Sequence, residues 1–194
     1  MGSKVTKNCK NVIIALGGNL PLGETPSKDI LEAAFLELTL LFGESSQKSR
    51  LFQTPCFPAG TGPDYINAVF TCFSELSPEE ILQHLHVIEA KFSRSREQRW
   101  GMRTLDLDLV AVDDQVEPDL PTYQQWLDLP LQEQKVQAPK QLILPHPRLQ
   151  ERAFVLVPLC DVQPNWMHPV LGKRAAELCA ELPKDEIAAV TPLK

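Results

Sequence analysis

The stretch TLDLDLVAV runs from Thr104 to Val112 and alternates polar with apolar residues. Such alternation is typical of a β-strand that buries one face. Side chains at positions i and i+2 of a strand share a face, so Asp106 and Asp108 are expected side by side. Two carboxylates about 7 Å apart could hold Mg²⁺, which usually takes one or two carboxylates and adds water and phosphate oxygens. A solvated strand face is the alternative for this pair alone.

Arginines gather just before this strand. Of the eight arginines in the chain, six fall in two short segments: Arg94, Arg96, Arg99 and Arg103, and then Arg148 and Arg152. The chain has a net charge of −6, so a local basic focus suggests a small anionic ligand more than a polyanion. Guanidinium groups bind phosphate oxygens bidentately. A solvated arginine loop is the alternative, but carboxylates beside arginines favour phosphoryl transfer.

Strand and helix patterns continue on either side of these groups. The expected elements are a buried strand at 12–16, a helix capped by Ser27 and ended by Gly43, an edge strand at 48–53, a strand at 66–73, a helix after the capping box Ser77-Pro78-Glu79-Glu80, and a last helix at 173–182. Together with the strand at 104–112, the order is β-α-β-β-α-β. It predicts an α+β fold with helices on a largely antiparallel sheet.

The segment from Asp113 to Gln141 differs in composition, with seven glutamines, six acidic residues and four prolines. Trp126 is its one large anchor. We expect an extended, partly mobile insertion here. The domain prediction is therefore a tag or flexible N-terminus at 1–10, followed by a single domain at 11–194 that carries the insertion.

Bulk features narrow the class of protein. The five cysteines include no C-x-x-C pattern, which argues against a disulfide framework or a zinc site. The sequence contains neither a membrane-length apolar run nor a secretory signal. These features, with the negative charge, predict a cytoplasmic protein that binds neither nucleic acid nor membrane. We also expect a monomer, although the sequence leaves the oligomeric state open.

Several aromatic and amide groups suit a flat ligand. Tyr65 and Asn67 share a strand face, where one could stack on a heterocycle and the other read its edge; a core tyrosine and a turn asparagine are the alternative. Trp100 lies inside the basic loop as either a core anchor or a lid residue. The combination of phosphate-binding and aromatic groups recurs at His146, Arg148, Arg152 and Phe154.

At this point the chain resembles a known family, 6-hydroxymethyl-7,8-dihydropterin pyrophosphokinase, from about Val12 to Pro169. The motifs that carry the likeness follow the family order: ALGGNL at 15–20, TP at 54–55, DYINAV at 64–69, RSREQRWGMRTLDLDL at 94–109 and LPHPRLQERAFVLVPL at 144–159. The resemblance implies a ferredoxin-like α+β fold. It also implies transfer of the β,γ-pyrophosphoryl unit of ATP to the pterin hydroxymethyl oxygen, with AMP as the other product.

The resemblance also implies roles for individual residues. Asp106 and Asp108 match the ligands of two Mg²⁺ ions, and with Arg94 and Arg103 they form the expected catalytic set. The ATP co-substrate is expected at Glu89, Arg94, Arg96, Arg103, His146 and Arg152. The reduced pterin is expected at Thr54, Pro55, Phe57, Tyr65, Asn67, Trp100 and Phe154. Members of the family can be fused to other folate enzymes.

Two other functions stay open at this level. A nucleotidyltransferase could use Gly17-Gly18 with the two aspartates and would release pyrophosphate, although the glycines lie about ninety residues upstream. A ferredoxin-like domain without catalysis could bind RNA or a small ligand, but the charge of −6 argues against RNA. Gly18, Ser93 and Met102 depart from residues common in the family, and none of them replaces a charged catalytic group.

Overall fold

The computed structural model describes residues 9–56, 60, 62–92, 103–130, 133 and 137–193. Their strands form one sheet in the order β5-β1-β4-β3-β6, and β2 also pairs with β4. The strands are β1 Lys10–Gly18, β2 Gln47–Lys48, β3 Phe52–Thr54, β4 Tyr65–Ser74, β5 Asp106–Val112 and β6 Thr191–Pro192. Every pairing is antiparallel. This sheet, with β1 and β4 at its centre, confirms the predicted ferredoxin-like α+β fold.

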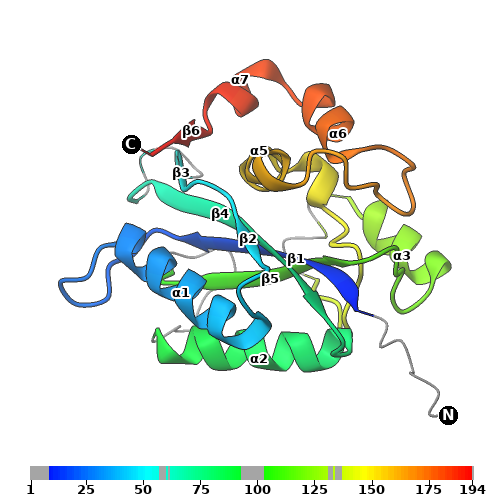
Figure 1. The fold of residues 1–194 in the computed structure, drawn as a ribbon. Helices are drawn as coiled ribbons and strands as arrows, with labels where there is room; N and C mark the ends of the chain where they lie inside the picture. The colour runs from blue at the N-terminus through cyan, green and yellow to red at the C-terminus, as the bar shows by residue number, and fades with distance from the viewer. Residues whose placement is uncertain are drawn as a thin grey trace, which may run out of the picture.

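Helices cover both faces of the sheet, as Figure 1 shows. They are α1 Ser27–Phe42, α2 Pro78–Lys91, α3 Leu120–Leu127, α5 Ala153–Val162, α6 Ala175–Glu181 and α7 Lys184–Ala188, with a 3₁₀ turn at Leu149–Glu151. α1 and α2 pack on one face, and α5 and α6 pack on the other. None of the described helices is long and apolar enough to cross a membrane.

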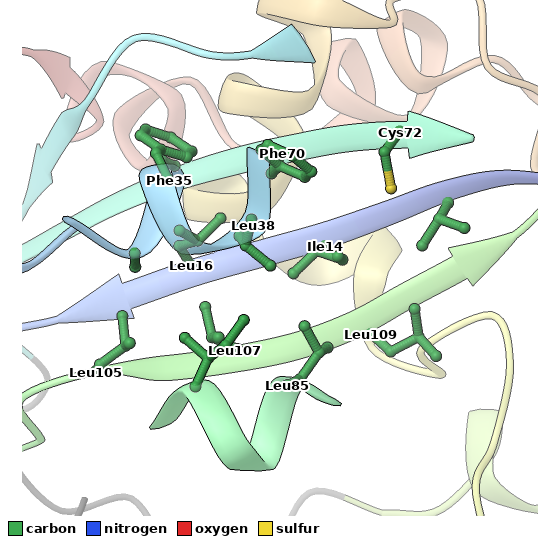
Figure 2. Close-up of a cluster of buried hydrophobic side chains, with 14 of the residues drawn as sticks. Ile14, Leu16, Phe35, Leu38, Phe70, Cys72, Leu85, Leu105, Leu107 and Leu109 are labelled. Atoms are coloured by element: carbon green, nitrogen blue, oxygen red, sulfur yellow. The ribbon is translucent and has the colours of Figure 1, made fainter. Parts of the chain in front are cut away.

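The period of two along the strands divides the core between these faces. Ile14 and Leu16 on β1 join Leu107 on β5 in the cluster under α1 and α2 (Figure 2). Each such buried leucine or isoleucine contributes about 2 kcal/mol of transfer free energy. Because neighbouring side chains in a strand point to opposite faces, Asp106 and Asp108 lie on the α5 side.

A β-bulge interrupts β5 just beyond the aspartates. Leu109 pairs with Ile14 and Ala111 pairs with Ile13, so Val110 has no partner on β1. Its carbonyl oxygen instead accepts the backbone N–H of His146 at 2.7 Å. The bulge thereby brings the turn that contains His146 to the same face as the aspartates.

The helix ends follow the sequence signals with one correction. The Ser77–Glu80 capping box is present at the start of α2, and Gly43 ends α1 with a φ of 94°. Ser27, predicted as an N-cap, is instead the first helical residue, and the preceding Pro26 makes no side-chain cap. The proline ring restricts φ at Pro26, and its extended backbone takes the N-cap position. Ser27 therefore becomes the first residue of the helix.

The Gln- and Pro-rich segment is more ordered than its composition predicts. α3 lies within it, and its N-cap Asp119 accepts the backbone N–H of Thr122 at 2.8 Å. Tyr123 is fully buried, whereas Trp126, the predicted anchor, is only partly buried. The phenol of Tyr123 lies 3.3 Å from Nε2 of the buried His168. The expectation of an extended segment is therefore wrong over Leu120–Leu127.

Candidate functional site

The candidate site lies on the α5 face, where three strands bring polar residues into one row. Gly17 on β1 is opposite Asp106 on β5 on one side and Asn67 on β4 on the other. The next row places Ala15 opposite Asp108. Since glycine and alanine carry almost no side chain, β1 forms a shallow floor between the carboxylates and the Asn67 amide.

Each aspartate lies beside an arginine, and the two arginines come from different parts of the chain. Arg103 Nη1 forms an ion pair with Asp106 Oδ2. Arg152 Nη1 lies 3.7 Å from Asp108 Oδ2, with side-chain exposures of 22% and 44%. Burial lowers the pKa of Arg152, and Asp108 opposes that shift. A guanidinium stays protonated at neutral pH in any case, so the site joins two cations with two anions.

His146 completes this cluster. With Asp108 and Arg152, it lines a small depression on the α5 face. Burial lowers the pKa of His146 well below its usual value, and the charge of Arg152 adds to the shift. Its Nδ1 accepts the backbone N–H of Arg148 at 3.1 Å. The neutral ring therefore carries its proton on Nε2, which makes that nitrogen a hydrogen-bond donor.

The residues expected to bind the pterin meet at the adjoining end of the sheet. Thr54 pairs with Tyr65 across β3 and β4, and Asn67 Nδ2 donates to Thr54 Oγ1 at 2.8 Å. Burial raises the pKa of the Tyr65 phenol; nearby Arg103 lowers it and Asp106 raises it. Both charged groups therefore lie within electrostatic reach of the Tyr65 ring.

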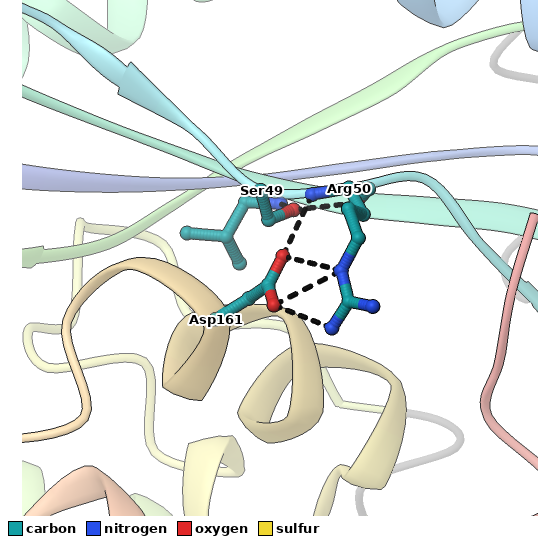
Figure 3. A network of polar contacts seen from close by, with 4 residues as sticks. Ser49, Arg50 and Asp161 are labelled. Carbon is teal, nitrogen blue, oxygen red and sulfur yellow. Dashed lines mark hydrogen bonds and ion pairs between the residues drawn. The ribbon is translucent and has the colours of Figure 1, made fainter.

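The start of α5 supplies an arginine and an aromatic ring together. Arg152 is the N-cap of α5, and its guanidinium lies 5.7 Å from the centroid of the Phe154 ring. Phe154 is 40% exposed, which leaves much of its ring accessible. At the other end of α5, Asp161 accepts hydrogen bonds from the backbone N–H and the guanidinium of Arg50 (Figure 3). These contacts attach α5 to the segment between β2 and β3.

Glu89 lies apart from this cluster, although it is expected at the nucleotide. It is 1% exposed on α2, and its Oε1 accepts the backbone N–H of Leu107 at 2.9 Å. β5 is the terminal strand of the sheet, so this carboxylate satisfies an edge N–H. Its position supports β5 from the side, and its role at the nucleotide stays a prediction.

Four expected site residues lie outside the described residues: Phe57, Arg94, Arg96 and Trp100. Pro55 is described and exposed. The structure thus brings together Asp106, Asp108, Arg103, Arg152, His146, Tyr65, Asn67, Thr54 and Phe154 from the predicted set.

The sequence interpretation missed the contribution of Gly18 and Asn19. A Cβ at Gly18 would lie 2.3 Å from the carbonyl oxygen of Thr104, so only glycine fits. Asn19 is 3% exposed and hydrogen-bonds Arg103. The motif ALGGNL contains both residues. It does not reveal that Asn19 contacts Arg103, because Arg103 is distant in the sequence.

Comparison with known proteins gives consistent matches. The model of the family described as 7,8-dihydro-6-hydroxymethylpterin-pyrophosphokinase (HPPK) matches residues 13–164. A 2-amino-4-hydroxy-6-hydroxymethyldihydropteridine pyrophosphokinase of Synechocystis sp. is 36% identical over 192 residues, covering 96% of this chain and 83% of its own. The enzyme of the same name from Pseudomonas aeruginosa is 34% identical over 179 residues, covering 92% and 95%.

Among solved structures, the fold matches that of Plasmodium falciparum HPPK-DHPS with a TM-score of 0.62 at 14% identity. The alignment covers 92% of this chain and 44% of that chain. This chain therefore spans less than half of the solved protein.

Proposed function

We infer the function from one premise, that this chain belongs to the 7,8-dihydro-6-hydroxymethylpterin-pyrophosphokinase family. It transfers the pyrophosphoryl unit of ATP to the hydroxymethyl group of 6-hydroxymethyl-7,8-dihydropterin, giving AMP and the pterin diphosphate in folate biosynthesis. The observation that carries this conclusion is the family match over 13–164. The meeting of arginines, carboxylates and aromatic rings on one face of the sheet supports it.

In this reaction the pterin hydroxyl oxygen attacks the β-phosphorus, the bond from the α-phosphoryl oxygen to that phosphorus breaks, and AMP leaves. Negative charge has to be neutralised on the transferred phosphates and on AMP. Arg103 and Arg152 would supply this neutralisation, and their positions beside the two carboxylates of the site support that role. The Nε2–H of His146 would donate to a phosphate oxygen bound beside Arg152, which lines the same small depression.

Mg²⁺ dependence, with two ions, is part of the proposal. Asp106 and Asp108 would hold the metal, and their hard carboxylate oxygens at i and i+2 fit Mg²⁺. Among the described residues, no cluster of three or more His, Cys, Asp or Glu side chains gathers to hold a metal. The remaining coordination positions would therefore fall to phosphate oxygens and water. When bound, the metal would neutralise phosphate charge and orient the β-phosphoryl group.

For the pterin, Tyr65 and Phe154 would contact the ring faces, and Asn67 would read the ring edge. The hydrogen bond from Asn67 Nδ2 to Thr54 fixes the amide, which leaves Oδ1 over Gly17 as an acceptor for a pterin N–H. Glycine is suited to that position because a larger residue would press on the amide. Phe57 and Trp100 belong to this set as predictions, as do Arg94 and Arg96 for the phosphates.

The alternatives are disfavoured by the family match. A nucleotidyltransferase would release pyrophosphate, whereas the relatives named above are pyrophosphokinases. The expectations of a cytoplasmic monomer stay predictions. Fusion of this kind of chain to a second folate activity occurs in the HPPK-DHPS protein.

A substrate-dependence assay tests the proposal. AMP formation is expected only when ATP, Mg²⁺ and the reduced pterin are all present, and it should stop with excess EDTA and resume with added Mg²⁺. AMP formation at an equal rate without the pterin would indicate a nucleotide hydrolase. Undiminished turnover in EDTA would contradict the metal assignment to Asp106 and Asp108.

A further inference from the structure

Asn19 follows directly after β1 and is buried. It lies between the proposed phosphate side of the site, at Arg103, and the proposed pterin side, at Tyr65. Its side chain is 3% exposed. Its Oδ1 accepts the backbone N–H of Arg103 at 3.0 Å, and its Nδ2 donates to the carbonyl oxygen of Pro63 at 3.1 Å. Both ends of one amide are therefore used, each by a different segment of the chain.

On the phosphate side, Asn19 holds the main chain of Arg103 at two points. The backbone N–H groups of Asn19 and Leu20 both donate to the Arg103 carbonyl, at 2.9 and 3.0 Å. With the side-chain bond, the N–H and the C=O of Arg103 are both fixed. The Arg103 side chain, which pairs with Asp106, therefore starts from a backbone that cannot shift independently of β1.

On the pterin side, Asn19 holds the segment that leads into β4. Pro63 lies two residues before Tyr65, the first residue of that strand. Gly18 packs against the Thr104 carbonyl on one side and pairs with Ile66 of β4 on the other, so the residue after it lies close to both segments. Tyr65 and Arg103 are then attached to a common support.

We propose that Asn19 is a positioning residue that sets the separation between the pterin subsite at Tyr65 and the phosphate subsite at Arg103. This inference rests on the proposed pyrophosphoryl transfer. In that reaction the hydroxymethyl oxygen and the β-phosphorus belong to different substrates, one held on each side of Asn19. Misplacement of reacting groups by about 1 Å can cost about a hundredfold in rate. The amide controls that distance without touching either substrate.

Asn19→Asp isolates the pterin-side contact. The carboxylate keeps an acceptor for the Arg103 N–H but loses the donor to Pro63 and faces its carbonyl oxygen with negative charge. We expect kcat to fall about thirtyfold to a hundredfold, while each substrate alone binds within about threefold of wild type, as measured by pterin fluorescence and nucleotide titration. A protonated carboxyl can donate to Pro63, so the ratio of variant to wild-type kcat should rise as the pH is lowered.

Asn11→Asp is the matched control. Asn11 lies at the other end of β1, where its amide makes two hydrogen bonds with the amide of Gln163, at 3.0 and 2.9 Å. This variant should lower the melting temperature without changing kcat or its pH profile. Asn19→Leu, which can donate at no pH, should lose kcat without recovery at low pH.

The outcomes test the positioning role of Asn19 separately from the proposed pyrophosphoryl transfer. Wild-type kcat in Asn19→Asp, measured below its melting temperature, would overturn the positioning role even if stability fell as much as in Asn11→Asp. A loss of kcat with the same pH profile as wild type would also overturn it, because the Pro63 contact would then be irrelevant. Absence of AMP formation by the wild-type chain would instead contradict the proposed function.

Discussion

The guanidinium of Arg103 is ion-paired with the carboxylate of Asp106, only three residues further along the chain. Asp106 is also one of the two carboxylates proposed to hold Mg²⁺. Arg103 and a divalent cation therefore compete for the same carboxylate, and phosphate would provide the arginine with another partner. Metal binding should be weak before the nucleotide arrives and stronger after it.

Arg103→Met should therefore strengthen the binding of Mn²⁺, used as a spectroscopic substitute for Mg²⁺, in the absence of nucleotide. We expect a gain of about twofold to fivefold, since a partly exposed ion pair contributes up to about 1 kcal/mol. Electron paramagnetic resonance of free Mn²⁺ measures this directly. The same variant should lose turnover, because the phosphates lose a cation.

Arg50→Met is the control for that experiment, because Arg50 pairs with Asp161 away from the site. It should leave Mn²⁺ binding unchanged. Asp106→Asn should weaken Mn²⁺ binding and lower turnover by orders of magnitude. Near-normal turnover of Asp106→Asn with Mg²⁺ would show that this carboxylate is not a metal ligand.

Gly18→Ala should destabilise the protein more than Gly17→Ala. The added methyl at position 18 would lie 2.3 Å from the Thr104 carbonyl oxygen, which is backbone and cannot turn away. Overpacking of this kind costs about 1–3 kcal/mol. At position 17 the neighbour is the Asn67 side-chain oxygen at 3.0 Å, so pterin affinity should fall more than stability. Urea denaturation and pterin titration of both variants test this, and equal stability losses would refute it.

Phe154→Ala should weaken pterin binding much more than nucleotide binding. Stacking of a flat heterocycle on an aromatic ring contributes about 1–3 kcal/mol, so the dissociation constant of the pterin should rise by about tenfold to a hundredfold. Phe73→Ala removes a 54% exposed phenylalanine from β4 far from the site and serves as control. Unchanged pterin affinity in Phe154→Ala would remove this ring from the proposed site.

Acid should destabilise the fold through His168. Burial lowers the pKa of this fully buried ring to about 4, and its Nδ1 accepts the backbone N–H groups of Val170 and Leu171, both at 3.2 Å. The unfolded state has a pKa near 6.5 and so binds more protons between these values. Stability that is complete above about pH 6.5 is therefore lost as the pH falls toward 4, by on the order of 3 kcal/mol.

Urea denaturation between pH 4 and 7.5 measures that loss. His168→Gln should be less stable at neutral pH and should show a flatter pH dependence. His84→Gln, at an exposed position on α2, is the control and should keep the wild-type slope. A wild-type slope in His168→Gln would assign the acid sensitivity to other groups.

Local patterns were sufficient for much of the fold and part of the site. The period of two placed Asp106 and Asp108 on one strand face, and the capping box located the start of α2. The contact between Gly18 and Thr104 was not predictable because it joins segments distant in sequence. α3 was missed although Asp119 followed by Pro121 is a helix-start signal, since the surrounding glutamines and prolines favoured a loop. The burial of Tyr123 depends on His168, which follows much later in the chain.

The most direct test of the central claim is the fate of labelled phosphate. The chain is supplied in parallel with ATP labelled at the α- or the γ-phosphorus, together with Mg²⁺ and 6-hydroxymethyl-7,8-dihydropterin. Pyrophosphoryl transfer predicts that the α-label appears only in AMP and the γ-label only in the pterin diphosphate, in equal amounts. The α-label in a pterin product, or the γ-label in free phosphate or pyrophosphate with no labelled pterin, would contradict it.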